Sequence, residues 1–357
     1  MNATEGCTAG TPQGASAPLG GSAPRVAGER GGKQRVRVQR RPVHGVLLLD
    51  KPLGLSSNDA LQKAKWLLRA EKAGHTGTLD PLASGVLPLC FGAATKFSQI
   101  HLDADKTYET EIALGVTTTT GDAEGQVLQT RAVTCSVGQV VEVLDQFMGA
   151  IDQVPPMHSA LKKGGKALYE YARAGVEVER EARRVTIHDL ELLDMQLTGE
   201  APFLRLRVTC SKGTYIRTLG EDIAAALGCG GHLRLLRRVQ TGIFDLSRSI
   251  TLAQLEALPE GERLAALLPV EDLLSPFPQV ELDEAEAGRF LSGLRRRLPD
   301  AADCPQVAVF GQQPRALLGL AHIKAGELIA QRLLTPVEIA QNLEQWAARK
   351  AYPPDAA

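Results

Sequence analysis

The order of the apolar segments along the chain limits the folds that it can adopt. Strand-like runs are expected at 43–50, 86–91, 106–114, 183–195, 203–210 and 242–246, and amphipathic helices at 60–70 and 218–227. Strands and helices mix without the regular alternation that builds parallel β-α-β units. The sequence therefore predicts an α+β fold, in which helices flank a mixed, largely antiparallel sheet.

Several classes of protein are excluded by what the chain lacks. No run approaches the ~18 consecutive apolar residues of a membrane-spanning helix. The six cysteines are scattered, without a Cys-x-x-Cys pair or a histidine cluster at zinc-ligand spacing, so we expect neither a disulfide scaffold nor a metal site. The first residues hold no apolar core of a secretory signal, which favours the cytoplasm.

Composition divides the chain into four stretches. Residues 1–42 hold eight Gly, four Pro and seven Lys/Arg against two Asp/Glu, which predicts a disordered extension that aids solubility or attracts phosphates. Residues 43–275 form the main domain, with a basic insertion at about 155–182. The acidic stretch 251–286 and two prolines after 275 mark a boundary. Beyond it, 276–336 indicates a small β-rich domain and 337–357 a tail.

Two motifs in the N-terminal half concentrate reactive side chains, and each also has a structural interpretation. In 74–85, three glycines surround His75 and Asp80, which suits a ligand-binding loop or an ordinary turn. Tyr108 lies in a strand-like run, where a tyrosine commonly serves packing rather than chemistry.

Two further motifs lie in the C-terminal half. Tyr215 and Arg217 stand two positions apart, so they share a face if the segment is extended. Arg217 could equally be a salt-bridged surface residue. The run 231–244 places three arginines in five positions, a pattern typical of phosphate contacts or of a solvated charged face.

In order and spacing these segments resemble the bacterial tRNA pseudouridine synthase B family. The family's Gly-His-Thr-Gly-x-Leu-Asp-Pro-Leu-Ala loop is matched at 74–83 and its Asp-Lys-Pro-x-Gly-x-Ser-Ser signature at 50–57. Its Lys-x-Tyr, Gly-Thr-Tyr-Ile-Arg and Leu-Arg-Arg…Gly-x-Phe elements are matched at 106–108, 213–217 and 236–244. The resemblance covers about 43–335 and implies a catalytic domain at 43–275 with a PUA-like RNA-binding domain at 276–336.

The resemblance also implies a reaction. Such an enzyme isomerises the uridine at position 55, in the T-loop of tRNA, by flipping the base, breaking its N-glycosidic bond and rejoining it through C5, without cofactor or metal. Asp80 would be the catalytic carboxylate, which could attack the sugar C1′, add to C6 of the ring or remove a proton from C2′. Arg217 would hold it ionised and oriented. Tyr108 would stack on the base and assist proton transfer at C5.

Substrate-binding roles follow from the same resemblance. His75 would fill the gap left by the flipped nucleotides, Tyr215 and Leu236 would line the uracil pocket, and Lys51 would support the substrate-binding loop. The basic insertion would clasp the T-stem-loop. We expect a monomer that binds tRNA, needs no guide RNA and does not bind a membrane.

Two other functions stay open. A tRNA-binding or tRNA-folding protein with secondary catalysis would need no carboxylate facing its phosphate-rich ligand. The guide-RNA-dependent archaeal and eukaryotic relatives carry acidic and Lys-rich tails that this sequence lacks.

The formal net charge of −1 argues against an RNA partner at first. It is a sum, however, of the basic stretch 1–42 and the acidic stretch 251–286, in which there are nine Asp/Glu and one Arg. The bulk charge therefore does not exclude an RNA partner.

Overall fold

The computed structural model describes residues 39–351. The extension expected at 1–42 lies mostly outside the described residues, but its last four residues are placed. Arg41 donates its amide proton to the Arg69 carbonyl and accepts from the Glu71 amide. Backbone pairing therefore secures the chain just before the first strand.

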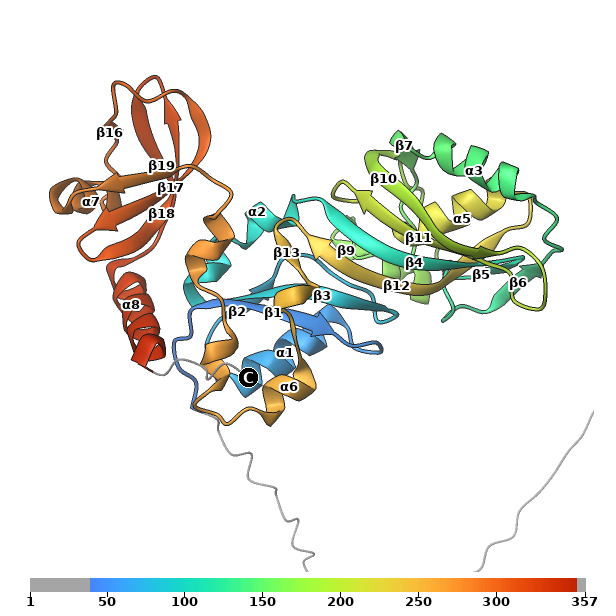
Figure 1. Ribbon diagram of the computed structural model, residues 1–357, viewed down its shortest axis with the longest axis horizontal. Coiled ribbons are helices and arrows are strands. Elements are labelled where there is room, and N and C mark those ends of the chain that lie inside the picture. Colours follow the sequence, from blue (N-terminus) through green and yellow to red (C-terminus); the bar gives the residue numbers. More distant parts are fainter. Residues whose placement is uncertain (1–38, 352–357) are drawn as a thin grey trace, which may run out of the picture. The chain divides into compact units, whose positions relative to one another are not determined.

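A large mixed sheet forms the platform for the site (Figure 1). Its main path is, in spatial order, β14 (Ile250–Thr251), β1 (Gly45–Lys51), β3 (Ala83–Phe91), β12 (Gly231–Thr241), β4 (Lys106–Leu114), β11 (Phe203–Cys210), β10 (Arg183–Gln196) and β7 (Gly149–Gln153). The short strands β2 (Ala73–His75) and β13 (Phe244–Asp245) pair with β3 and β12. Neighbours are antiparallel, except that β1 with β14 and β3 with β12 are parallel. The predicted sheet type is confirmed.

The central strand β12 corrects one expectation. Its three arginines suggested a charged surface run, whereas the structure makes 231–241 a strand between β3 and β4. Arg234 pairs with Glu111 (2.5 Å) and Arg237 with Asp50 (2.7 Å). Arg238 is 1% exposed. Because carboxylates of β1 and β4 pair with Arg237 and Arg234, these charges do not prevent strand formation.

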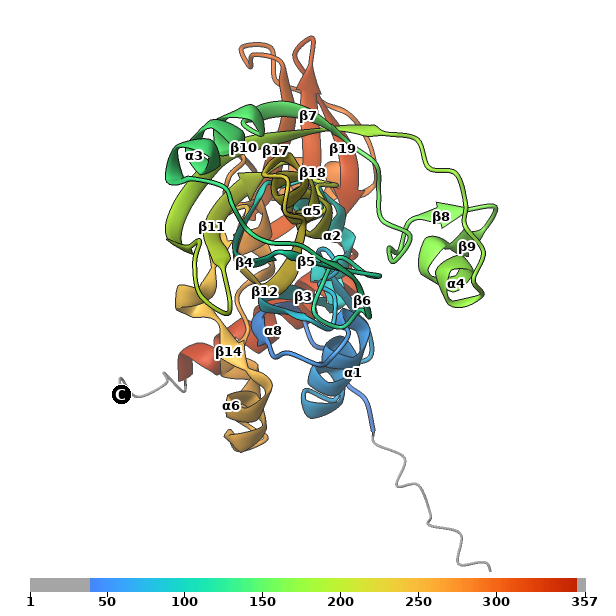
Figure 2. The same ribbon diagram turned by 90° about the vertical axis from the view of Figure 1, so that its right-hand side faces the viewer.

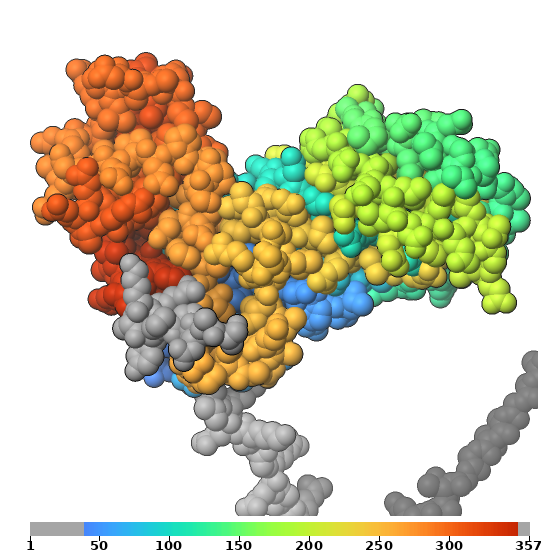
Figure 3. Space-filling view, in the orientation of Figure 1, coloured from blue at the N-terminus to red at the C-terminus, as the bar shows by residue number. Residues whose placement is uncertain are grey.

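Helices flank the sheet and connect its strands. The two predicted helices are α1 (Ser57–Leu67) and α5 (Ile216–Ala226), which begin two or three residues earlier than expected. α6 (Leu252–Ala257) lies against α1, where Lys63 and Glu256 form an ion pair (2.7 Å), and Figure 3 shows these blue and gold segments side by side. The others in this part are α2 (Ser98–Leu102), α3 (Val137–Gln146) and α4 (Leu168–Arg173).

The basic insertion forms a small unit of its own. The hairpin of β8 (Lys162–Lys163) and β9 (Lys166–Ala167) continues into α4, and this unit stands away from the large sheet (Figure 2). A second hairpin, β5 (Val116–Thr118) with β6 (Val127–Thr130), follows β4.

The C-terminal part holds a separate five-stranded sheet. Its order is β15 (Gln279–Leu282), β17 (Cys304–Gln312), β18 (Arg315–Lys324), β19 (Glu327–Leu333) and β16 (Arg296–Arg297), with α7 (Glu284–Leu291) beside it. Much of the expected tail forms α8 (Pro336–Ala351). This helix contacts the first domain: Glu338 binds Lys96 (2.6 Å), and Gln341 and Gln345 hydrogen-bond to the buried His44.

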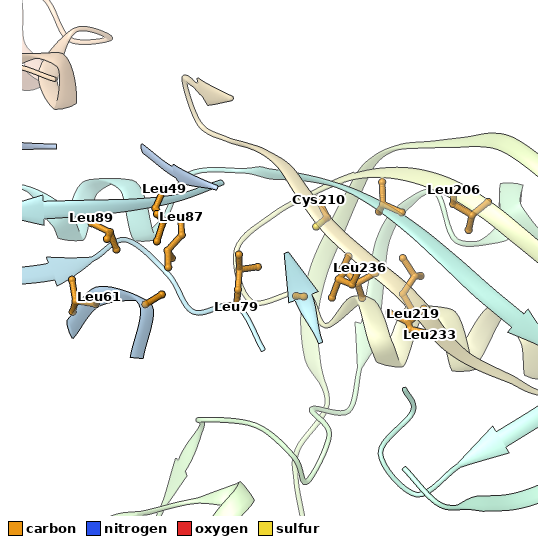
Figure 4. Packing of buried hydrophobic residues seen from close by; sticks show 14 of the residues in the cluster. Leu49, Leu61, Leu79, Leu87, Leu89, Leu206, Cys210, Leu219, Leu233 and Leu236 are labelled. Carbon is orange, nitrogen blue, oxygen red and sulfur yellow. The ribbon is translucent and has the colours of Figure 1, made fainter. Parts of the chain in front are cut away.

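Among the described residues, the buried hydrophobic side chains form three clusters. One cluster packs the large sheet against its helices, and it includes leucines of β1, β3, α5 and β12 (Figure 4). A second cluster joins residues of both parts, such as Val46, Phe97, Phe310 and Leu317. The third lies within the C-terminal part.

Candidate active site

A cavity of about 380 Å³ opens where the loop before β3 meets β4, β12 and the start of α5. This volume lies in the range of pockets that hold small ligands. Five of the seven residues singled out from the sequence line it, and these are Asp80, Tyr108, Tyr215, Arg217 and Leu236.

The loop that carries Asp80 is held at both ends. Before it, the Ser57 hydroxyl donates to the Leu79 carbonyl (2.9 Å) and accepts from the Leu79 amide (2.7 Å). After it, the Ala83 amide closes a turn on the Asp80 carbonyl (3.0 Å). At Gly85, where φ is +106°, a Cβ would lie 2.1 Å from a backbone oxygen of β12, so glycine permits β3 to approach that strand.

Arg217, in the first turn of α5, gathers two carboxylates. Its Nη2 lies 2.8 Å from Oδ2 of Asp80, and its Nη1 lies 3.4 Å from Oδ2 of Asp122. It also donates to the carbonyls of Thr120 (3.1 Å) and His158 (2.7 Å). Arg217 and Asp122 are 6% and 5% exposed, whereas Asp80 is 41% exposed. A fixed guanidinium therefore orients a carboxylate that a ligand can reach.

Tyr108 lies on β4 opposite Val208 of β11 and Arg238 of β12. Burial raises the pKa of its phenol, and the nearby Arg238 guanidinium opposes this rise. The phenol is consequently protonated at neutral pH. Tyr108 supplies the aromatic surface of the cavity beside Asp80.

Tyr215 and Leu236 complete this part of the wall. The Tyr215 amide donates to Oε1 of Gln153 (2.9 Å), and its carbonyl accepts from Nε2 of Gln153 (3.2 Å). Gln153, at the end of β7, is 2% exposed, so this pairing fixes the approach to α5. Leu236 belongs to the core and to the cavity wall (Figure 4).

Lys51 and His75 are not among the residues that line the cavity. Lys51 is fully buried and its Nζ donates to the carbonyls of Pro52 (2.8 Å) and Leu55 (2.7 Å). Burial lowers its pKa to about 8, an effect that Asp80 opposes. Burial lowers the pKa of His75, and the positive charge of Arg238 lowers it further. Lys51 thus supports the loop that follows β1.

The structure adds Asp122, Gln153 and Arg238 to this region. Asp122 and Gln153 belong to none of the motifs recognised in the sequence. Arg238 lies in the arginine run, but its burial excludes the phosphate contact that the run suggested.

Within residues 39–351, no three His, Cys, Asp or Glu side chains come close enough to hold a metal ion. No helix among these residues is long and apolar enough to cross a membrane.

This arrangement suits a reaction on a planar base. An accessible carboxylate stands beside an aromatic ring and an apolar wall, which are the groups that a flipped nucleotide base needs for attack and stacking. The cavity therefore has the features of an enzyme active site that takes a flipped base, with Asp80 as its accessible carboxylate.

Comparison with known proteins identifies the family. Family models match the N-terminal domain of TruB family pseudouridylate synthases at 65–216, the tRNA pseudouridylate synthase B C-terminal domain at 217–275 and the C-terminal domain of pseudouridine synthase II TruB at 278–334. The tRNA pseudouridine synthase B of Verminephrobacter eiseniae is 62% identical over 88% of this chain and 96% of that protein. That of Cupriavidus taiwanensis is 59% identical over 84% and 96%. The chain belongs to the TruB family of pseudouridylate synthases.

Solved structures agree with this assignment. A Cbf5-Nop10-Gar1 complex contains a chain with 26% identity and a TM-score of 0.62, covering 83% of this chain and 86% of that one. An H/ACA RNP bound to a substrate RNA containing 2'-deoxyuridine matches with 25% identity and a TM-score of 0.61, over 82% and 86%. The protein is an enzyme that isomerises uridine in RNA to pseudouridine, and the predicted fold class, with its β-rich C-terminal domain, is confirmed.

Proposed function

We propose that this enzyme isomerises the uridine at position 55 in the T-loop of tRNA, acting in the cytoplasm as a monomer without a guide RNA. The observation that carries the proposal is the Asp80–Arg217 ion pair (2.8 Å) at a cavity walled by Tyr108. The names of the relatives, tRNA pseudouridine synthase B at 62% and 59% identity, support tRNA as the substrate.

The chemistry centres on Asp80. Arg217 binds its Oδ2, which leaves Oδ1 to attack the sugar carbon as the N-glycosidic bond breaks. The electron pair of that bond leaves with uracil. After the base has turned, C5 bonds to the sugar carbon while the bond between that carbon and Oδ1 breaks, which restores the Asp80 carboxylate. The oxygen of Tyr108, which has given its own proton to water, takes the C5 proton, and N1 gains a proton from water. Atoms and charge balance without a redox step.

Two RNA-binding regions would hold the substrate. We assign residues 43–275 to catalysis and 276–336 to a PUA-like RNA-binding domain. The insertion exposes Lys162, Lys163 and Lys166, whose charges suit the backbone of the T-stem-loop. Ser159, Ala160 and Leu161, at its base, line the cavity, so RNA held by the insertion would lie next to Asp80.

The decisive experiment incubates the purified chain with an unmodified T-stem-loop and maps pseudouridine by mass. We expect wild type to convert the T-loop uridine without added RNA. Asp80→Asn should bind the RNA with unchanged affinity but form no product, because the amide is isosteric and lacks the charge. Binding without conversion by wild type would favour a tRNA-folding protein. Conversion only after addition of a second RNA would indicate a guide-dependent enzyme. Unchanged turnover by Asp80→Asn would show that Asp80 is not the catalytic carboxylate.

A further inference from the structure

Arg238 is a buried cation that the chemistry above does not use. Its side chain lines the cavity, and the residue is 1% exposed. Its Nε donates to the Val86 carbonyl (2.8 Å), whereas its Nη2 is buried and has no hydrogen-bond partner among the described residues. No carboxylate of residues 39–351 forms an ion pair with it. Burying a cation and leaving one of its donors unused is energetically unfavourable, so a functional reason is expected.

Three strands fix the position of this guanidinium. In the sheet, Arg238 stands opposite Gly85 of the parallel strand β3 and opposite Tyr108 of the antiparallel strand β4. Residues that stand opposite each other in a ladder point to the same face, so Arg238 and Tyr108 face the cavity together. The loop before β3 confines it as well, because Nη1 of Arg238 lies 3.6 Å from the position that a Cβ would occupy at Gly77. Arg238 is therefore held beside Tyr108 with little freedom to move.

We propose that Arg238 is a positioning residue that holds Tyr108 in place and stabilises the negative charge of its oxygen before that oxygen accepts the C5 proton. The step rests on the proposed function. The phenol of Tyr108 first gives its proton to water, and its ionised oxygen then takes the proton from C5, whose C–H electron pair restores the ring double bond. Tyr108 is then a phenol again, and N1 gains from water the proton that the phenol had released.

The charges around Tyr108 make Arg238 distinctive. Asp80 faces it from the loop before β3 and Cys210 from the end of β11, and both raise the pKa of the phenol, as burial does. Arg238, from β12, opposes these effects. Removing its charge should therefore make Tyr108 harder to ionise.

The first test titrates tyrosine ionisation in the folded protein by absorbance. The chain has five tyrosines, and Tyr108→Phe identifies the contribution of Tyr108 by difference. We expect Arg238→Gln to move this ionisation to higher pH and Arg238→Lys to restore part of the shift. Arg238→Met replaces the Gln variant if that one does not fold. Arg207→Gln is the matched control. Arg207 lies on β11, the strand next to the β4 strand of Tyr108, and pairs with Glu109 and Glu191 on the face of the sheet opposite to Tyr108.

The second test measures the single-turnover rate on the T-stem-loop from neutral to alkaline pH. Arg238→Gln should lower the rate about 10- to 100-fold at neutral pH and move its rising limb to higher pH, with unchanged RNA affinity. An unshifted Tyr108 ionisation, or an equal loss of rate at every pH, would overturn the proposal. Failure of wild type to modify the T-loop would instead refute the proposed function, because the absorbance titration needs no substrate.

Discussion

Ser56 and Ser57 are neighbours in the chain, yet their hydroxyls serve different structures. Ser56 caps α1 by accepting from the Asp59 amide (3.1 Å), whereas Ser57 binds both backbone groups of Leu79, next to Asp80. Each alanine variant should lose stability, about 0.5–2 kcal/mol for Ser56→Ala and about 1–3 for Ser57→Ala. Only Ser57→Ala should also lower the single-turnover rate. Urea unfolding and pseudouridine assays of both variants test this difference, and equal rates would contradict the anchoring role.

Asp122 gives a second prediction at the scale of single residues. It is buried beside Arg217, so Asp122→Asn should leave the guanidinium less firmly oriented toward Asp80. We expect the rate to fall roughly 10-fold or more, with unchanged RNA affinity. Asp152→Asn is the control, because Asp152 is 59% exposed and forms a surface ion pair with Arg184. A rate equal to that of the control would show that Asp80 and Arg217 need no second carboxylate.

The buried Lys51 predicts a pH dependence of stability. Burial lowers its pKa from the usual 10.5 to about 8, so between these values the unfolded chain holds a proton that the folded protein lacks. Unfolding then takes up a proton, and the free energy of unfolding due to Lys51 rises with pH from about 8 to 10.5. Urea titrations should show that Lys51→Met lacks this rise. Parallel pH profiles of wild type and variant would refute it.

Sequence motifs located the residues expected to touch substrate better than those that position them. Asp80, Tyr108 and Arg217 stand in recognisable patterns, and the structure brings them to one cavity. Asp122 contacts Arg217 and Gln153 contacts Tyr215, which are 95 and 62 residues away in the sequence. Such partners depend on tertiary geometry, so no local pattern distinguishes them from ordinary surface residues.

At the scale of elements, strands with regular alternation were predictable to within a residue. The runs 106–114 and 203–210 are β4 and β11 as expected. β12 was missed because its arginines interrupt the apolar alternation. The hydrogen bonds of these arginines are accepted by groups on three other strands, namely Asp50 of β1, Val86 of β3 and Glu111 of β4. A charged run becomes a central strand only when such partners exist.

The ladder between β3 and β12 gives a prediction at this scale. Gly85→Ala places a Cβ against a backbone oxygen at a positive φ, which costs at least about 1–3 kcal/mol in strain. Gly74→Ala, in the same segment, meets open space at an ordinary φ and should change stability much less. Thermal unfolding of the two variants tests this. Similar melting temperatures would show that β3 can shift away from β12.

At the scale of the whole molecule, α8 connects the two sheets through specific polar contacts. Glu338 binds Lys96 of the first domain and also accepts from the Thr335 amide (2.8 Å) at the start of α8. Glu338→Gln should therefore lower the free energy of unfolding by about 1 kcal/mol and increase hydrogen exchange along α8. Glu344→Gln is the control on the same helix. Equal exchange in both variants would show that Lys96 does not hold the helix.

The contacts of His44 have a consequence for building chimeras. Its ring accepts from the Ala93 amide (3.0 Å) and lies 3.1 Å from Oε1 of Gln341, while its backbone pairs with Gln345. Both ends of the described chain thus meet at one residue. A crossover after 275 that imports another relative's C-terminal part would separate His44 from the glutamines that match it. Working hybrids should require the donor's residues at 44, 341 and 345 to travel together.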